Sequence, residues 1–213
     1  MSNLRIKTMV LGAVSTNCYL VYHEETKKAV IIDPADNGPY IIRQCQLLGL
    51  KPEAVLLTHG HFDHMLAAVE LKKQYGCPIC AGAEEAAMLR DPSLNLSGTC
   101  GTEQTGFEAD QLLRDGQEVS FAGYQWKVIA TPGHTAGSVS YYIEEEGVLF
   151  SGDTLFAESL GRTDLPTGNA RIIIRSIIDK LFILPEDTMV YPGHDHPTSI
   201  GHEKVANPVV PYM

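Results

Sequence analysis

Residues 58–64 read Thr-His-Gly-His-Phe-Asp-His and directly follow the apolar run 54–57. Three histidines and one aspartate therefore lie within six consecutive positions. Packing needs no such cluster, and crowded imidazoles repel one another when they are charged. A metal ion removes that cost, because it binds neutral imidazole nitrogens and carboxylate oxygens and keeps them unprotonated. The segment predicts one half of a metal site.

Two later histidines stand in nearly the same context, a strand pattern that ends in Pro-Gly and is followed by the histidine. They are His134 and His194. Between them, the apolar run 148–150 is followed by Ser-Gly and then by Asp153. Because strand ends converge at one edge of a layered sheet protein, we expect these three side chains to meet the histidine cluster and complete the site.

The combined set of ligands is too large for one ion. A catalytic zinc typically takes three protein ligands and keeps one position open. This chain offers seven ligands: His59, His61, Asp63, His64, His134, Asp153 and His194. The count favours two divalent metal ions per chain. Zinc is the expected metal, with iron and manganese as alternatives.

The spacing within the cluster divides these ligands. His59 and His61 reach one ion from an extended turn, while Asp63 and His64 on the first helical turn point to the other side. The expected assignment is His59, His61 and His134 to the first ion, Asp63, His64 and His194 to the second, and Asp153 as the bridge. Two ions roughly 3.5–4 Å apart would hold a hydroxide of lowered pKa between them. That hydroxide is the expected nucleophile, and Asp63 is the catalytic residue that orients it.

The elements that must position these residues alternate along the chain. Short apolar runs between turn residues predict strands, and apolar residues at helical spacing predict helices. Strands are expected at 5–11, 17–22, 29–32, 54–57, 79–81, 118–121, 125–130, 138–143, 148–150 and 188–191, and helices at 40–48, 65–75, 84–89 and 172–183. Strand 54–57 delivers the histidine cluster at its carboxyl end. This order predicts two sheets packed face to face with helices outside.

Composition limits the class of protein. The chain has 213 residues, of which 44% are hydrophobic and 20% charged, and no linker or repeat divides it, so we expect one domain spanning residues 1–213. The net charge is −10 and no cluster of lysine and arginine is visible, which disfavours nucleic acid as a partner. No run approaches the roughly 18 apolar residues of a membrane span. We expect a small-molecule acyl substrate and no membrane partner, and the oligomeric state stays open.

The five cysteines are odd in number and irregularly spaced. That pattern argues against a disulfide framework and favours a reducing compartment, the cytoplasm. Cys77 and Cys80 match a redox or zinc motif, but no second pair accompanies them. Because their side chains would face opposite ways on a short strand, we interpret them as core cysteines.

The histidine string, with Gly-His134, Gly-Asp153 and Gly-His194 following in that order, resembles the metallo-β-lactamase superfamily. The resemblance covers nearly the whole chain. It implies an α/β fold, a four-layer αββα sandwich of two mixed sheets flanked by helices, with metals at one edge. Four further segments are most similar to the glyoxalase II-like (hydroxyacylglutathione hydrolase-like) branch: 16–21, 150–156, 161–166 and 201–208. This branch implies a metal-dependent hydrolase of small acyl thioesters.

Other functions use a similar motif. Persulfide dioxygenases resemble the chain in the histidine motif and in Gly-Arg-Thr-Asp at 161–164, and use a single iron. Lactonases are a further alternative, because the same hydroxide opens a lactone. Arg162 is either a contact for a substrate carboxylate or part of a turn with an ion pair. Beyond His194, Lys204 is the only lysine or arginine, so the basic clamp that holds glutathione in full-length glyoxalase II has no visible counterpart.

Overall fold

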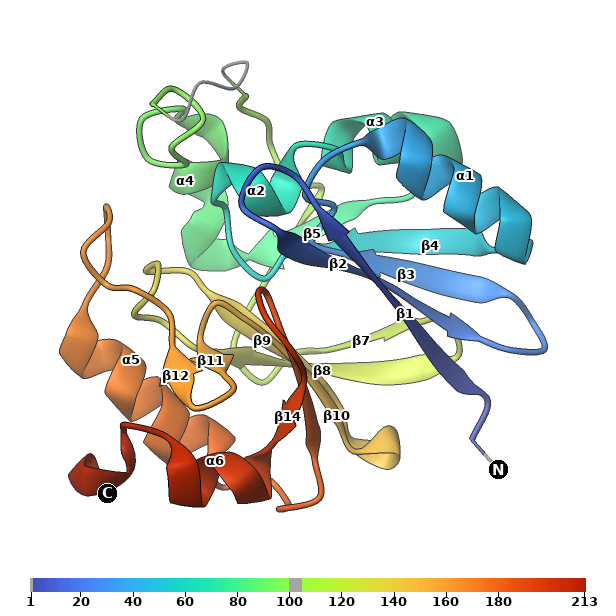
Figure 1. Ribbon diagram of the computed structural model, residues 1–213. Coiled ribbons are helices and arrows are strands. Elements are labelled where there is room, and N and C mark those ends of the chain that lie inside the picture. Colours follow the sequence, from blue (N-terminus) through green and yellow to red (C-terminus); the bar gives the residue numbers. More distant parts are fainter. Residues whose placement is uncertain (1, 100–104) are drawn as a thin grey trace.

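Two six-stranded mixed sheets stack face to face in the computed structural model, and helices cover their outer sides (Figure 1). The structure describes residues 2–99 and 105–213, so Cys100 lies outside the described residues. The arrangement confirms the expected α/β class and the αββα sandwich. Within the described ranges, no helix is both long enough and apolar enough to cross a membrane.

The first sheet has the strand order β1-β2-β3-β4-β5-β6. Its strands are β1 (Leu4–Leu11), β2 (Thr16–His23), β3 (Lys28–Ile32), β4 (Lys51–Leu56), β5 (Ile79–Gly82) and β6 (Gln111–Leu113). β2 is antiparallel to β1 and β3, whereas β3 to β6 are parallel to one another. The carboxyl ends of β3, β4 and β5 therefore reach one edge of the sheet, where β2 begins.

The second sheet has the order β14-β13-β10-β9-β8-β7. Its strands are β7 (Glu118–Phe121), β8 (Tyr124–Ala130), β9 (Val139–Ile143), β10 (Val148–Gly152), β13 (Met189–Pro192) and β14 (Thr198–Ser199). β9 is antiparallel to β8 and β10, and β10 is parallel to β13, so β8, β10 and β13 point the same way. A hairpin of β11 (Leu155–Phe156) and β12 (Ser159–Leu160) follows β10.

Helices lie outside both sheets (Figure 1). Those beside the first sheet are α1 (Gly38–Leu48), α2 (Phe62–Met65), α3 (Ala68–Tyr75), the 3-10 turn η1 (Ala83–Glu85) and α4 (Ala86–Arg90). Those beside the second sheet are α5 (Ala170–Ser176), its π-helical continuation η3 (Ile177–Leu181) and α6 (Ile200–Ala206). Local chemistry sets the ends of α1: the Asn37 side chain accepts the Tyr40 N–H, and Gly49 ends the helix in the left-handed conformation.

Three apolar clusters hold the layers together. The cluster between the sheets contains the fully buried Trp126 and Phe150. Leu56 of β4 joins that cluster, while its neighbour Val55 joins the cluster beneath α1 and α3, as the alternation of a strand requires. Because both faces of β4 are buried, the strand is apolar throughout its last residues, and its direction into the histidine cluster is firmly set.

The interpretation of the two cysteines as core residues is confirmed. Cys77 and Cys80 are buried free thiols. Cys77 packs in the cluster beneath the helices, and Cys80 packs between the sheets, so the two side chains lie on opposite faces of the first sheet.

Several predicted elements differ in extent. The helix expected at 65–75 is interrupted between α2 and α3, because the backbone N–H of Ala67 donates to the carbonyl of Pro34 instead of continuing the helical ladder. The helix expected at 172–183 combines α5 with a π-helical turn. Sequence patterns missed β6, β11, β12, β14 and α6. Strands of two or three residues carry too few side chains to show alternation.

Candidate metal centre

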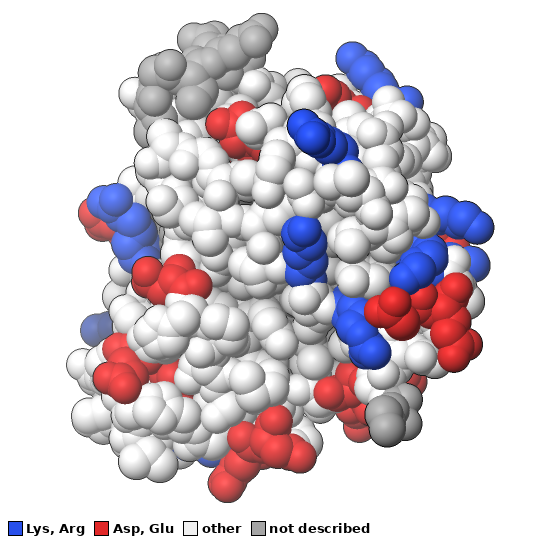
Figure 2. Space-filling view, turned by 45° about the vertical axis from the view of Figure 1, so that its right-hand side comes forward, with Lys and Arg blue, Asp and Glu red and all other residues white. Residues whose placement is uncertain are grey.

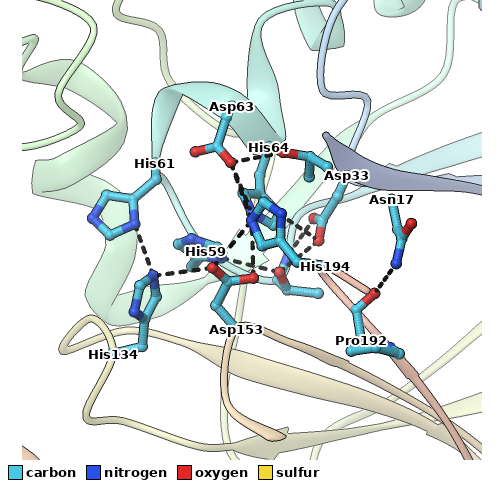
Figure 3. Close-up of polar contacts among 12 residues, drawn as sticks. Asn17, Asp33, His59, His61, Asp63, His64, His134, Asp153, Pro192 and His194 are labelled. Carbon is cyan, nitrogen blue, oxygen red and sulfur yellow. Dashed lines mark hydrogen bonds and ion pairs between the residues drawn. The ribbon is translucent and has the colours of Figure 1, made fainter. Parts of the chain in front are cut away.

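The structure brings together the carboxyl ends of strands from both sheets. Residues 58–64 follow β4, His134 follows β8, Asp153 follows β10, and His194 follows β13. All seven predicted ligands meet in this place, and their donor atoms face one another (Figure 3). The convergence follows from topology, because β8, β10 and β13 point the same way toward the edge where β4 ends.

The cluster has two halves that share Asp153. The donor atoms of His59, His61 and His134 lie within 4.8 Å of one another, and we call these residues the first half. The donor atoms of Asp63, His64 and His194 also lie within 4.8 Å of one another, and we call these the second half. Asp153 faces both halves: its Oδ1 is 3.4 Å from His64 Nε2, and its Oδ2 is 3.5 Å from His134 Nε2.

The donor set fits divalent metal ions. Among the described residues, His59 Nε2, His61 Nε2, His64 Nε2 and Asp153 Oδ1 are buried without a hydrogen-bond partner. Orphaned buried polar atoms are costly and rare in native structures. Asp63 Oδ2 lies 3.4 Å from the Nε2 atoms of both His64 and His194, which is long for a hydrogen bond. Two ligands bound at 2.0–2.2 Å to one tetrahedral ion are about 3.4 Å apart.

The histidine rings are oriented from outside the centre. Thr58 Oγ1 donates to Asp33 and therefore accepts from His59 Nδ1, at 3.2 Å. His134 Nδ1 donates to the carbonyl of Arg162, at 2.8 Å. In the rings of His59 and His134 the outer nitrogen is engaged and Nε2 faces the centre, which is the arrangement that metal-binding histidines require.

The first half is a neutral environment. Burial and the neighbouring imidazoles hold the pKa of His59 well below its usual value. Burial, with His134 beside it, lowers the pKa of His61 to about 3. Burial lowers the pKa of His134 as well, against the pull of Asp153. These rings are therefore unprotonated at neutral pH and present lone pairs to a cation.

The second half is ionic. Burial opposes charge on His64, but the nearby carboxylates, led by Asp63, raise its pKa to about 9. Burial likewise opposes charge on His194, yet the neighbouring carboxylates of Asp153 and Asp63 raise its pKa to about 10. Asp63 is buried, but His64, His194 and Thr16 hold its pKa below its ordinary value. Carboxylates are thus ionised here, ready for a cation.

Sequence reasoning missed Asp33, which follows β3. It accepts from the backbone N–H of Thr58 at 2.8 Å and from the Thr58 hydroxyl at 2.7 Å, and it lies 3.0 Å from His64 Nδ1. Asp33 holds a φ of 46°, a left-handed conformation that is uncommon outside glycine. The Asp-Pro pair that ends strand 29–32 gave the only sequence signal, and it indicated a strand end rather than a ligand support.

Thr16 and Asn17, at the start of β2, were also missed as site residues. Thr16 Oγ1 donates to Asp63 Oδ2 at 2.7 Å. Asn17 Nδ2 donates to the carbonyl of Pro192 (Figure 3) and to that of Asp195, and these two residues flank His194. The first residues of β2 therefore orient the second half from the opposite end of the chain.

Glycine permits the close approach at the last histidine. A Cβ on Gly193 would lie 2.1 Å from Asp153 Oδ1 and 2.8 Å from His64 Cε1. Only a residue without a side chain fits between these ligands. The Gly-His pattern noted in the sequence therefore has a steric reason here.

Arg162 lies at the rim of the centre. Its carbonyl holds His134, while its guanidinium Nε donates to Asp164 at 2.7 Å and Nη2 donates at 2.8 Å. Both side chains of this pair are exposed. The turn with an ion pair, one of the two alternatives for this segment, is what the structure contains. A contact with a substrate carboxylate stays a prediction.

A cavity of about 370 Å³ opens onto the centre. Polar atoms come from ligands of both halves and from Arg162. Its apolar walls are formed by Val14, Phe62, Leu96 and Leu165. A volume of this size takes a small molecule.

Comparisons with known proteins agree with this geometry. Residues 11–194 match the family described as the metallo-beta-lactamase superfamily. The chain is 37% identical over 206 residues to the probable metallo-hydrolase YqgX of Bacillus subtilis, covering 96% of this chain and 97% of that one. It is 34% identical over 207 residues to the hydroxyacylglutathione hydrolase GloC of Haemophilus influenzae, with coverage of 96% and 97%.

Solved structures share the fold. The BLEG-1 B3 metallo-beta-lactamase superposes with a TM-score of 0.91 at 39% identity, covering 96% of this chain and 98% of that one. A di-iron-bound form of TTHA1623 gives 0.84 at 33% identity, with coverage of 95% and 98%. ETHE1 from Myxococcus xanthus gives 0.78 at 33% identity, with coverage of 96% and 83%.

Proposed function

The chain belongs to the metallo-β-lactamase superfamily and is a metal-dependent hydrolase by its relatives, and from that premise we propose that it hydrolyses small acyl thioesters with two divalent ions. One observation carries the proposal: the buried atoms His59 Nε2, His64 Nε2 and Asp153 Oδ1 have no hydrogen-bond partner, and they belong to two ligand sets that share Asp153. The catalytic unit is the single domain expected for residues 1–213.

Each half of the centre would hold one ion, with Asp153 between them. Ions in such a place lower the pKa of water and polarise a carbonyl group. The chain's own residues orient the reacting groups. Asp63 is fixed by the Thr16 hydroxyl at 2.7 Å, so its carboxylate keeps one orientation toward the reacting water.

The cavity supports a small acyl substrate. Val14, Leu96 and Leu165 offer an apolar wall to an acyl chain beside the donor atoms. The name of GloC points to glutathione thioesters, and the chain covers 97% of the length of that relative. Glutathione thioesters therefore belong among the first substrates to test, although Lys204 is the only lysine or arginine beyond His194 and pairs with Glu186 at 3.7 Å.

The surface charge supports a small-molecule partner. On the face in Figure 2, lysine and arginine side chains stand singly or beside acidic ones, and they form no continuous basic area. The net charge of −10 acts in the same direction. Neither observation favours nucleic acid.

Zinc is the expected metal, with iron and manganese as alternatives. The donor set of imidazole and carboxylate suits all three. The di-iron form of TTHA1623 adds weight to iron, because that protein is 33% identical over 95% of this chain.

A second candidate function is a single-iron oxidoreductase of the persulfide dioxygenase kind. A third group of donor atoms, from His59, His64 and Asp153, also lies within 4.8 Å. Two histidines and one carboxylate form the ligand set of many non-haem iron oxygenases. This set draws one residue from each half and the shared aspartate, so it would leave the remaining ligands without an ion.

Metal analysis of the purified protein, followed by a screen of thioesters, lactones and a persulfide, tests the proposal. We expect about two ions per chain and the highest kcat/KM on a thioester. One iron per chain with oxygen uptake on the persulfide would overturn the hydrolase. Two ions with turnover of lactones alone would keep the centre and change the substrate class.

A further inference from the structure

A buried carboxylate, that of Glu85, lies against the two loops that carry the first half of the centre. Glu85 ends η1, directly after β5, and is 1% exposed. Thr135 Oγ1 donates to its carboxylate, and so does the backbone N–H of Gly60. The proposed function gives Glu85 no role.

The two donors are the chain neighbours of the first-half ligands. Gly60 stands between His59 and His61, and Thr135 directly follows His134. One carboxylate therefore joins the loop after β4 to the loop after β8. These loops come from different sheets, and the three ligands of the first half depend on their relative position.

The contact between these loops is built tightly. A Cβ on Gly137 would lie 2.3 Å from the backbone nitrogen of Glu85 and 2.9 Å from its Cγ. Thr135 Oγ1 also lies 2.6 Å from Ser138 Oγ, so the loop after β8 folds back on the same hydroxyl. A larger residue at Gly137 would push Glu85 away from both donors.

His61 needs such support more than the other two ligands. His59 is braced by Thr58, and His134 by the carbonyl of Arg162. In the part of the chain that the structure describes, the ring of His61 bonds only to His134, at 2.9 Å. Its direction therefore follows from the backbone at Gly60, which Glu85 holds.

The charge of Glu85 is also unusual. Burial raises its pKa to about 7, and no cation acts on it among the described residues. An unpaired buried carboxylate is costly to a fold. Such a carboxylate becomes favourable beside a cation. The three ligands of the first half are neutral imidazoles, so they do not balance the charge of an ion bound there.

We propose that Glu85 is a positioning residue and counter-charge for the ion held by His59, His61 and His134. It acts through Gly60 and Thr135, without touching the ion. The inference rests on the proposed two-ion centre. It predicts that the first half loses affinity when Glu85 is neutralised, while the second half keeps its own.

Titration of the metal-free full chain with Co²⁺ tests this role. We expect E85Q to weaken the binding of one of two Co²⁺ ions by about 10- to 100-fold, the usual cost of losing a partner behind a metal ligand. The control E84Q removes an exposed charge from the adjacent position and should bind both ions as the native chain does. T135V, which removes one donor, should give a smaller loss on the same ion.

Two further measurements separate positioning from general damage. Since the buried charge disfavours folding at pH 8, metal-free E85Q should melt no lower than the native chain at that pH. In an H61A background, which lacks the first-half ion, E85Q should cause no further loss of Co²⁺.

The outcomes are distinct. If the native protein binds two ions and E85Q binds both with unchanged affinity, the role of Glu85 is overturned and the two-ion centre stands. Equal weakening of both ions with a lower melting temperature assigns Glu85 a purely structural part and overturns the inference as well. A native chain that binds fewer than two Co²⁺ ions overturns the two-ion centre, and the inference falls with it.

Discussion

The two halves of the centre differ in charge and in support. The first half consists of three buried imidazoles whose pKa values are lowered, so it offers lone pairs but no negative charge of its own. The second half contains Asp63 and two histidines whose pKa values are raised by carboxylates. His194 in this half is also 22% exposed, whereas His59 and His61 are nearly inaccessible.

Two sites with the same number of ligands therefore need not bind a cation equally well. The second half attracts a cation through its own carboxylates. The first half relies on the shared Asp153 and, by our inference, on Glu85.

Asp153 is the residue that belongs to both halves, so D153N should impair both halves at once. We expect a loss in kcat/KM on the order of 10³-fold, larger than the 10- to 100-fold typical of outer partners. The metal-to-protein ratio should fall at the same time. D187N, an exposed aspartate in a distant turn, is the control. Near-native turnover in D153N would rule out a bridging role.

Single ligand losses should divide the centre. H61A is expected to keep the second-half ion and H194A the first-half ion, each with about one ion per chain and a loss in kcat/KM on the order of 10²-fold. Competition with a chromophoric chelator measures the affinity that remains. We expect tighter binding in H61A, because its intact half contains Asp63. Equal affinities in the two variants would contradict the charge difference.

Among the described residues, the Thr16 hydroxyl bonds only to Asp63, so T16V should affect chemistry without removing an ion. Loss of one hydrogen bond to a charged group corresponds to about 10-fold in rate. We expect kcat to fall by that factor, with KM and the metal content unchanged. Metal analysis beside steady-state kinetics checks this. A fall in metal content would show that Thr16 supports Asp63 as a metal ligand rather than as the residue that orients the reacting water.

The smallest effect is proton release. His64 has a pKa near 9 and is protonated at pH 7.5 in the metal-free chain, whereas His61, with a pKa of about 3, is already neutral. Metal binding to the second half should therefore release about one proton or more, and binding to the first half close to none. Calorimetry of H61A and H194A in two buffers of different ionisation enthalpy measures the difference. If both variants release the same number of protons, the raised pKa values do not belong to His64 and His194.

The ligands could be predicted from the sequence because they are dense and repeated. Three histidines within six positions, and two Pro-Gly-His turns, stand out without any structure. The residues that support these ligands do not stand out in the sequence. Asp33, Thr16 and Glu85 are single polar residues whose partners lie 25, 47 and 50 positions away in the chain. Nothing in their local sequence distinguishes them from turn, strand-start or helix-surface residues.

The same limit applies to the fold. Long strands and the two sheets could be predicted from alternation and from turn residues. The break between α2 and α3 could not, because it depends on a carbonyl at Pro34 that reaches Ala67 only in the folded chain. Similarly, β14 pairs with β13 over two residues, too few for a periodic signal.

The bonds of Asn17 to the carbonyls of Pro192 and Asp195 join positions 175 and 178 residues apart. The second half of the centre therefore cannot close until the last strands have been synthesised and have left the ribosome. His59, His61 and His134 are all available much earlier. The histidines of the first half are therefore synthesised before the ligand set of the second half is complete, so the order of translation separates the two sets in time.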